Sequence, residues 1–231
     1  MPKALAPRPG GAGRNRPRPA AQTGLPRDVM EELQRVTKPT QLRDAASRLA
    51  RAVQLLERGD AQGAATEGTK AKSLSSRSGA VREVLGLALY GQGRWHDSLT
   101  ELKAYRRFSG RADQNHVIAD CLRALGRPDE AVPLAEEALR AKVPTEVKAE
   151  AVIVAASALA DQQRFAEALA FLGRAKTDQR VAEPHTLRLW YVRGDILAKA
   201  GRRDEAAEAF RMVMRHDASA FDTAERLAEL G

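Results

Sequence analysis

The chain has 231 residues, a formal charge of +8 and 43 alanines, while aromatic residues make up only 4% of it. This length suits one large domain or two small ones, and the composition favours helices over an all-β sandwich. One cysteine excludes an intrachain disulfide framework and a cysteine-rich zinc site. The longest apolar run covers residues 151–156, far short of a membrane-spanning helix.

Residues 1–27 form a segment with six basic residues, no acidic residue and six of the eleven prolines. We expect this tail to be disordered, because it has too few large apolar residues to offset the entropy of ordering it. It fits neither a secretory signal nor a transit peptide, so a cytoplasmic location is expected. The excess of Arg over Lys and the many alanines are typical of a GC-rich bacterium. The basic residues are Lys3, Arg8, Arg14, Arg16, Arg18 and Arg27.

The rest of the chain alternates helix-like segments with short breaks that recur every 33 to 38 residues. A small residue follows each break by five positions, and an apolar residue precedes it by four. This period predicts antiparallel helix pairs that stack on one another, since a single pair cannot bury its apolar face. The middle residues of the breaks are Gly59, Gly93, Gly126, Gln163 and Gly201.

The last unit carries the pattern best, with Trp190, Gly194 and Leu197 before the break and Ala206 and Phe210 after it. These residues and their weaker copies resemble the tetratricopeptide repeat (TPR) family. The resemblance implies an all-α, right-handed TPR-type helical solenoid in one domain, residues 28–231. We expect a leading helix over 28–37, five degenerate repeats over about 45–218, and a capping helix over about 220–230.

Catalytic groups do not stand out. His116 and Asp120 are four residues apart on one predicted helix, where a surface hydrogen bond is expected rather than a metal half-site. Cys121 precedes the core residue Leu122, which indicates an inert packing role. We therefore expect no catalytic residue, no metal and no cofactor, and a protein that is not an enzyme.

The resemblance also implies where a partner would bind. In TPR proteins the first helix of each pair lines a concave groove, and here the corresponding positions are apolar in the first two repeats and acidic in the middle. The resemblance places Ala46, Leu49, Val53 and Leu56 at groove positions of the first repeat, and Ala80, Glu83, Leu87 and Tyr90 at those of the second. The sequence therefore predicts a non-catalytic protein-protein interaction scaffold whose partner segment is apolar and basic. The positions expected to contact the partner are Glu83, Leu87, Tyr90, Asp113, His116, Asp120, Arg123, Glu150, Ile153, Arg188, Tyr191 and Asp195.

The tail supports a second hypothesis. Six flexible cations can contact the phosphates of RNA or DNA without reading sequence, which would make the protein a ribosome- or nucleic-acid-associated factor. Two alternatives stay open: the tail could be a solubilising extension, or it could lie in the protein's own acidic groove. No membrane partner is expected.

Overall fold

The computed structural model describes residues 24–175 and 183–230, and these residues form helices and connecting turns without any strand. The chain divides into two compact units, Met1–Cys121 and Leu122–Gly231, each of which is described by itself. The tail residues Lys3, Arg8, Arg14, Arg16 and Arg18 lie outside the described residues.

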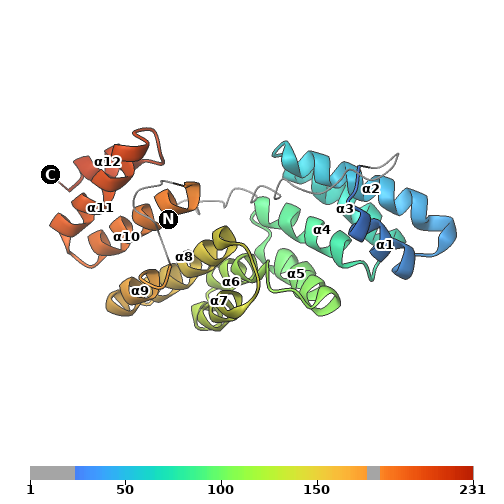
Figure 1. The fold of residues 1–231 in the computed structure, drawn as a ribbon, viewed down its shortest axis with the longest axis horizontal. Helices are drawn as coiled ribbons and strands as arrows, with labels where there is room; N and C mark the ends of the chain where they lie inside the picture. The colour runs from blue at the N-terminus through green and yellow to red at the C-terminus, as the bar shows by residue number, and fades with distance from the viewer. Residues whose placement is uncertain (1–23, 176–182, 231) are drawn as a thin grey trace. The chain divides into compact units, whose positions relative to one another are not determined.

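Unit 1 contains two antiparallel helix pairs, α2 with α3 and α4 with α5, and α3 packs against α4 (Figure 1). A further helix, α1, precedes the pairs and contacts α2 and α4. The division between the two units falls within α6. The bounds are α1 (Arg27–Val36), α2 (Pro39–Glu57), α3 (Ala61–Leu74), α4 (Gly79–Gly91), α5 (Trp95–Ser109) and α6 (Asn115–Ala124).

Unit 2 contains the pairs α8 with α9 and α10 with α11, while α7 packs on α8 and α12 packs on α11. A short 3₁₀ turn, η1 (Pro128–Glu130), leads into α7. The bounds are α7 (Ala131–Arg140), α8 (Thr145–Asp161), α9 (Phe165–Leu172), α10 (Pro184–Lys199), α11 (Arg203–His216) and α12 (Thr223–Ala228).

The five predicted breaks share one turn geometry. The middle residue has a positive φ of 60° to 80°. Gly adopts such an angle without strain, and Gln163 adopts it at the break in unit 2 where Gly is absent. The next residue donates its backbone N–H to the carbonyl five positions back, at 2.9 or 3.0 Å in every case. This is the bond pattern that closes a helix with a left-handed residue and reverses the chain. The sequence period is therefore the spacing of these turns.

Small residues within the pairs allow close helix contact. A Cβ atom on Gly86 of α4 would lie 2.7 Å from the side chain of Leu102 on α5, and one on Gly194 of α10 would lie 2.7 Å from the ring of Phe210 on α11. Leu102 and Phe210 have no exposed surface. The two glycines thus make room for large, fully buried side chains between paired helices.

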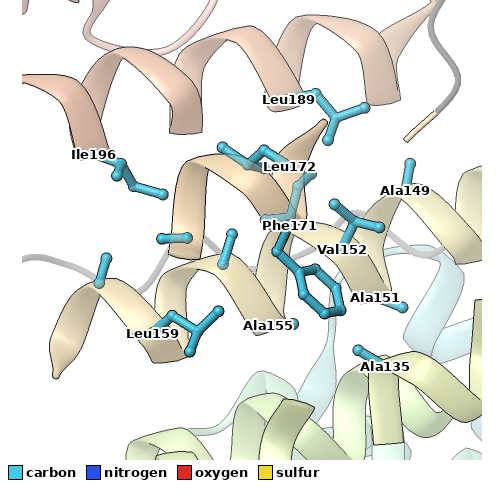
Figure 2. Close-up of a cluster of buried hydrophobic side chains, with 14 of the residues drawn as sticks. Ala135, Ala149, Ala151, Val152, Ala155, Leu159, Phe171, Leu172, Leu189 and Ile196 are labelled. Carbon is cyan, nitrogen blue, oxygen red and sulfur yellow. The ribbon is translucent and has the colours of Figure 1, made fainter. Parts of the chain in front are cut away.

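The core of unit 2 is made mainly of alanines that receive a few large side chains (Figure 2). Phe171 of α9 points toward the alanine-rich α8, its ring also reaches toward Ala135 of α7, and Leu172 belongs to the same cluster. Leu189 and Ile196 of α10 complete the cluster. Small residues on α8 therefore allow three neighbouring helices to share one core.

The ends of the folded region differ from the expected bounds. Leu25 is buried in the core of unit 1 and Arg27 begins α1, so neither belongs to a disordered tail. Pro39 is the first residue of α2, a position that tolerates a missing N–H.

The predicted capping helix over 220–230 is shorter than expected. Asp217 accepts hydrogen bonds from the backbone N–H and the hydroxyl of Ser219, and Phe221 has a φ of 58°. These residues form a turn, which delays the start of α12 to Thr223.

Candidate protein-binding faces of the two units

We define the A-face of each unit as the predicted groove positions on the first helices of its pairs. The A-face of unit 1 lies on α2, α4 and α6 as far as Cys121, and the A-face of unit 2 lies on α8 and α10, with Arg123 at the end of α6. These positions are mostly buried or half-buried, so their exposure alone does not make them a site. What surrounds them differs between the units.

The apolar part of the A-face of unit 1 is covered by α1. Leu33 of α1 has no exposed surface and lies in one cluster with Ala46 and Leu49 of α2 and Ala80 of α4. Leu25, Val29 and Met30 add to the same cluster. The predicted groove positions of the first repeat thus already hold a helix of the chain itself.

Polar contacts fix the register of α1. The Oε1 atom of Glu32 accepts a hydrogen bond from the Ser78 hydroxyl at 2.8 Å and one from the Ala80 N–H at 3.3 Å. Both donors belong to the start of α4, where free N–H groups favour a carboxylate. The Thr37 and Ser75 hydroxyls share a buried hydrogen bond of 2.7 Å just beyond the end of α1.

The polar part of the A-face of unit 1 centres on Glu83 and Asp113. Glu83 accepts a hydrogen bond from the amide of Gln114 at 2.8 Å, and burial raises the pKa of its carboxyl group. Asp113 accepts a hydrogen bond from the Tyr105 hydroxyl at 2.7 Å and pairs with Arg111 at 2.5 Å. Burial and the neighbouring carboxylates raise the pKa of Tyr105, so its hydroxyl stays a donor.

Tyr90 and Asp120 come together across successive repeats. The Tyr90 hydroxyl donates to the Asp120 carboxylate at 2.5 Å, and both side chains are buried. The predicted pairing of His116 with Asp120 at the surface is thus revised, because Asp120 is only 8% exposed. Leu87 and His116 are half-buried on the same helices, α4 and α6.

The A-face of unit 2 pairs its carboxylates mainly with basic side chains. Glu150 of α8 meets Arg188 of α10 at 2.9 Å, with each side chain 16% exposed. Arg123 pairs with Asp161 at 2.9 Å. Asp195 pairs with Lys199 and, at 2.6 Å, with Arg226 of α12.

Two further positions complete this face. The Tyr191 hydroxyl donates to Asp222 at 2.5 Å, and burial raises the pKa of Tyr191. Ile153 is buried in the core of unit 2, which makes it a packing residue more than an exposed contact.

Within each unit, the structure brings the predicted positions together in pairs. Groove residues of one repeat bond to residues about 30 to 38 positions later, which is one repeat along the chain. The sequence reasoning missed seven partners, and a search at this spacing could have found four of them, Gln114, Asp161, Asp222 and Arg226. The missed residues are Glu32, Tyr105, Arg111, Gln114, Asp161, Asp222 and Arg226.

Side chains that could ligate a metal ion do not gather in the described part of the chain. None of its His, Cys, Asp and Glu residues form a cluster of three or more that could hold a metal ion. Burial raises the pKa of the Cys121 thiol to about 11, as expected for a packing residue. No helix over residues 24–175 or 183–230 combines the length and apolar character needed to cross a membrane.

Comparisons with known proteins agree with this architecture. The tetratricopeptide repeat family model matches residues 116–180 and 174–223. No curated protein matches the chain in sequence.

Two solved structures share the fold. One is YrrB, described as a TPR protein with an unusual peptide-binding site, at 17% identity over 85% of this chain and 96% of that chain, with a TM-score of 0.55. The other is TTC0263, a thermophilic TPR protein of Thermus thermophilus, at 18% identity over 80% and 98%, with a TM-score of 0.63. The turns, the helix pairs, the family match and the shared fold lead to one conclusion: the chain has the helical fold of TPR proteins, and its residues 116–223 match the tetratricopeptide repeat family.

Proposed function

We propose that the protein is a non-catalytic scaffold that binds segments of partner proteins on its A-faces. The observation that supports this most directly is the pairing of groove positions across successive repeats, such as Glu83 with Gln114 and Glu150 with Arg188. Bonds of this kind make a continuous surface from separate helices, and such a surface can accept an extended or helical segment. The peptide-binding site described for YrrB is consistent with this role.

The A-face of unit 1 favours an apolar and basic segment. Glu83 accepts a hydrogen bond from the neutral amide of Gln114, whereas Asp113 pairs with Arg111. A neutral donor leaves the charge of an ionised carboxylate uncompensated, so basic side chains of a partner would be attracted there.

The test compares partner capture by the full chain and by a charge-neutralised variant. Glu83→Gln with Asp113→Asn removes two negative charges and keeps the side-chain shapes. Glu57→Gln with Asp204→Asn is the matched control, because both residues are exposed and lie outside the predicted groove positions. We expect the first pair to release partners that the control retains, after nuclease treatment and with native circular dichroism. Equal retention by both variants would reject this binding face.

The charge distribution supports a second candidate function, nucleic-acid binding through the tail. Residues 1–121 carry 21 basic and 12 acidic residues, whereas residues 122–231 carry 17 and 18. Most of the positive charge therefore belongs to the tail and unit 1. The tail hypothesis predicts that RNA binds the full chain and weakens steeply as salt rises.

A chain that starts at Gly24 tests this hypothesis and retains Leu25 in the core. If all five cations before Gly24 contact single-stranded RNA, the slope of log K against log salt falls by about 3.5 when they are removed. Filter binding at several salt concentrations measures the slope. Equal slopes for the two chains would eliminate the tail as the RNA-binding element.

A further inference from the structure

Helix α1 stands apart from the repeats. The predicted repeats use α2 to α11 as five successive pairs, and α1 precedes them without a partner helix of its own. It contacts α2 and α4, the first helices of the first two pairs. Its position is therefore that of an added helix on the A-face of unit 1.

The contacts of α1 coincide with the positions where the resemblance placed a partner. Leu33 lies among Ala46, Leu49 and Ala80, three of the predicted groove positions of the first two repeats. The opposite side of α1 is exposed at Arg27, Glu31, Gln34 and Arg35. A helix with one face in the groove and the other in solvent has the geometry of a bound ligand.

The recognition features of α1 form a short pattern. Leu25, Val29 and Leu33 follow one another at four-residue spacing and belong to the same apolar cluster. Glu32, directly before Leu33, places its carboxylate at the start of α4. The apolar residues supply burial, and the carboxylate fixes direction and register.

We propose that α1 is an internal ligand of the A-face of unit 1, and that a partner replaces it with an amphipathic helix of the same pattern. The partner helix carries apolar residues at four-residue spacing and a carboxylate directly before the last of them. This inference rests on the proposed scaffold function and deepens it by naming the ligand class and its internal competitor. The connection through Thr37 and Lys38 is extended, so α1 stays tethered when it is displaced.

The test uses a fluorescent peptide with the sequence of residues 24–38 and two full-length chains. Leu33→Asp in the chain removes the anchor of α1 and leaves every residue of α2 and α4 unchanged. We expect the peptide to bind this variant at least tenfold more tightly than the wild-type chain, because the internal competitor is weakened. Fluorescence anisotropy measures both affinities.

Matched peptides test the pattern. A peptide with Leu33→Asp is expected to lose binding, and one with Glu32→Gln to bind several-fold more weakly. A peptide with Glu31→Gln is the control, since Glu31 is exposed and bonds to Arg27 on the same helix. Equal weakening by the Glu32 and Glu31 changes would contradict the assigned register.

A second chain covers the case in which Leu33→Asp disturbs the fold. Val29→Ala with Met30→Ala loosens α1 more gently, because both side chains are only partly buried. The proposal is overturned if a loosened chain with native circular dichroism fails to bind the peptide, or binds it no more tightly than the wild type. That failure would leave the capture experiment on Glu83 and Asp113 unaffected, so the two proposals can fail separately.

Discussion

The two units are built from the same helix pairs and turns, yet they treat the carboxylates of their A-faces differently. In unit 1, Glu83 is held by the neutral amide of Gln114, whereas in unit 2 Glu150 is held by Arg188. The first arrangement keeps a negative charge and the second cancels it. The same fold can therefore present two electrostatic surfaces. The residue that bonds to the carboxylate from the next repeat, neutral in unit 1 and basic in unit 2, decides which surface forms.

The terminal helices differ in a parallel way. Helix α1 docks mainly through buried apolar side chains, with Leu33 at the centre. Helix α12 is short, and hydrogen bonds and ion pairs join its region to α10, from Tyr191 to Asp222 and from Asp195 to Arg226. Removing α1 would expose a cluster that a fully buried leucine closes, while removing α12 would break polar contacts and uncover an apolar cluster that partly buried side chains cover.

The chain offers a separate reporter for each unit. It has two tryptophans, Trp95 on α5 in unit 1 and Trp190 on α10 in unit 2. Trp95 lies against Tyr90, and Trp190 is buried beside His216. Variants with one tryptophan replaced by Phe would follow the unfolding of the other unit by fluorescence.

The largest expected effect comes from Leu33→Ala. Loss of a fully buried leucine typically costs about 2–5 kcal/mol in the free energy of unfolding. Leu227→Ala on α12 is the comparison in unit 2, and it should cost less because Leu227 is partly exposed. Urea titration followed through Trp95 and Trp190 measures the two costs, and a larger loss at Leu227 would contradict the contrast between α1 and α12.

The next effect concerns the close contacts within the pairs. Gly86→Ala and Gly194→Ala each force a Cβ atom into a fully buried side chain, and overpacking of this kind costs about 1–3 kcal/mol. Gly194 should be the more sensitive position, because the Phe210 ring is less adaptable than Leu102. Gly79→Ala is the control, with its nearest neighbours at 3.7 Å. Thermal unfolding that ranks Gly79→Ala as the most damaging change would refute this reading of the helix pairs.

A smaller effect should have opposite signs in the two units. Burial raises the pKa of Glu83 above its ordinary value, so the ionised carboxylate destabilises unit 1 at neutral pH. Glu83→Gln is therefore expected to raise the stability at pH 7. The advantage should shrink as the pH falls through the raised pKa, because the wild-type group then becomes protonated in the folded state.

The matched change in unit 2 is Glu150→Gln. It leaves Arg188 without its carboxylate, and we expect a loss of about 1 kcal/mol at pH 7, since the pair is only partly shielded from solvent. Melting temperatures of both variants between pH 4 and pH 7 test the contrast. Destabilisation by both changes at pH 7 would show that the two units do not differ in this respect.

The smallest effect is expected at the turns. Arg94 pairs with Asp97 in unit 1, and Arg202 pairs with Glu205 in unit 2, three residues later in each case. All four side chains are well exposed, so solvent screens the pairs. Arg94→Ala and Arg202→Ala should leave the melting temperature unchanged in scanning calorimetry. A clear drop in melting temperature for only one of the two variants would show that the two turns differ in stability despite their shared geometry.

Sequence reasoning succeeded where local chemistry repeats. Four of the five left-handed turns have Gly as their middle residue, and the close contact at Gly86 or Gly194 requires a small residue. Both kinds of residue therefore recur in the sequence with the repeat period. The docking of α1 leaves no such trace, because it is a single tertiary contact outside the repeat. The spacing of Leu25, Val29 and Leu33 indicates an apolar face but does not name the surface that it meets.

Contact of the predicted groove positions with a partner stays a prediction, but the structure shows what surrounds these positions. Tyr90, Asp120, Glu150 and Arg188 do face residues of neighbouring repeats, as the repeat period implies. Whether a carboxylate there is neutralised depends on the residue one repeat later, so a reading of each repeat alone misses it. The predicted tail ended too late for a related reason, because Leu25 is ordered by residues far along the chain.

The burial of Cys121 has a practical consequence. Its raised pKa of about 11 lowers the fraction of reactive thiolate roughly a hundredfold relative to an ordinary thiol, and its side chain is not exposed. Cysteines introduced at exposed positions can therefore be coupled to maleimide dyes while the native cysteine stays in place. Dyes at Gln34 on α1 and at Glu57 at the end of α2 would turn the detachment of α1 into a change in energy transfer that single molecules can report.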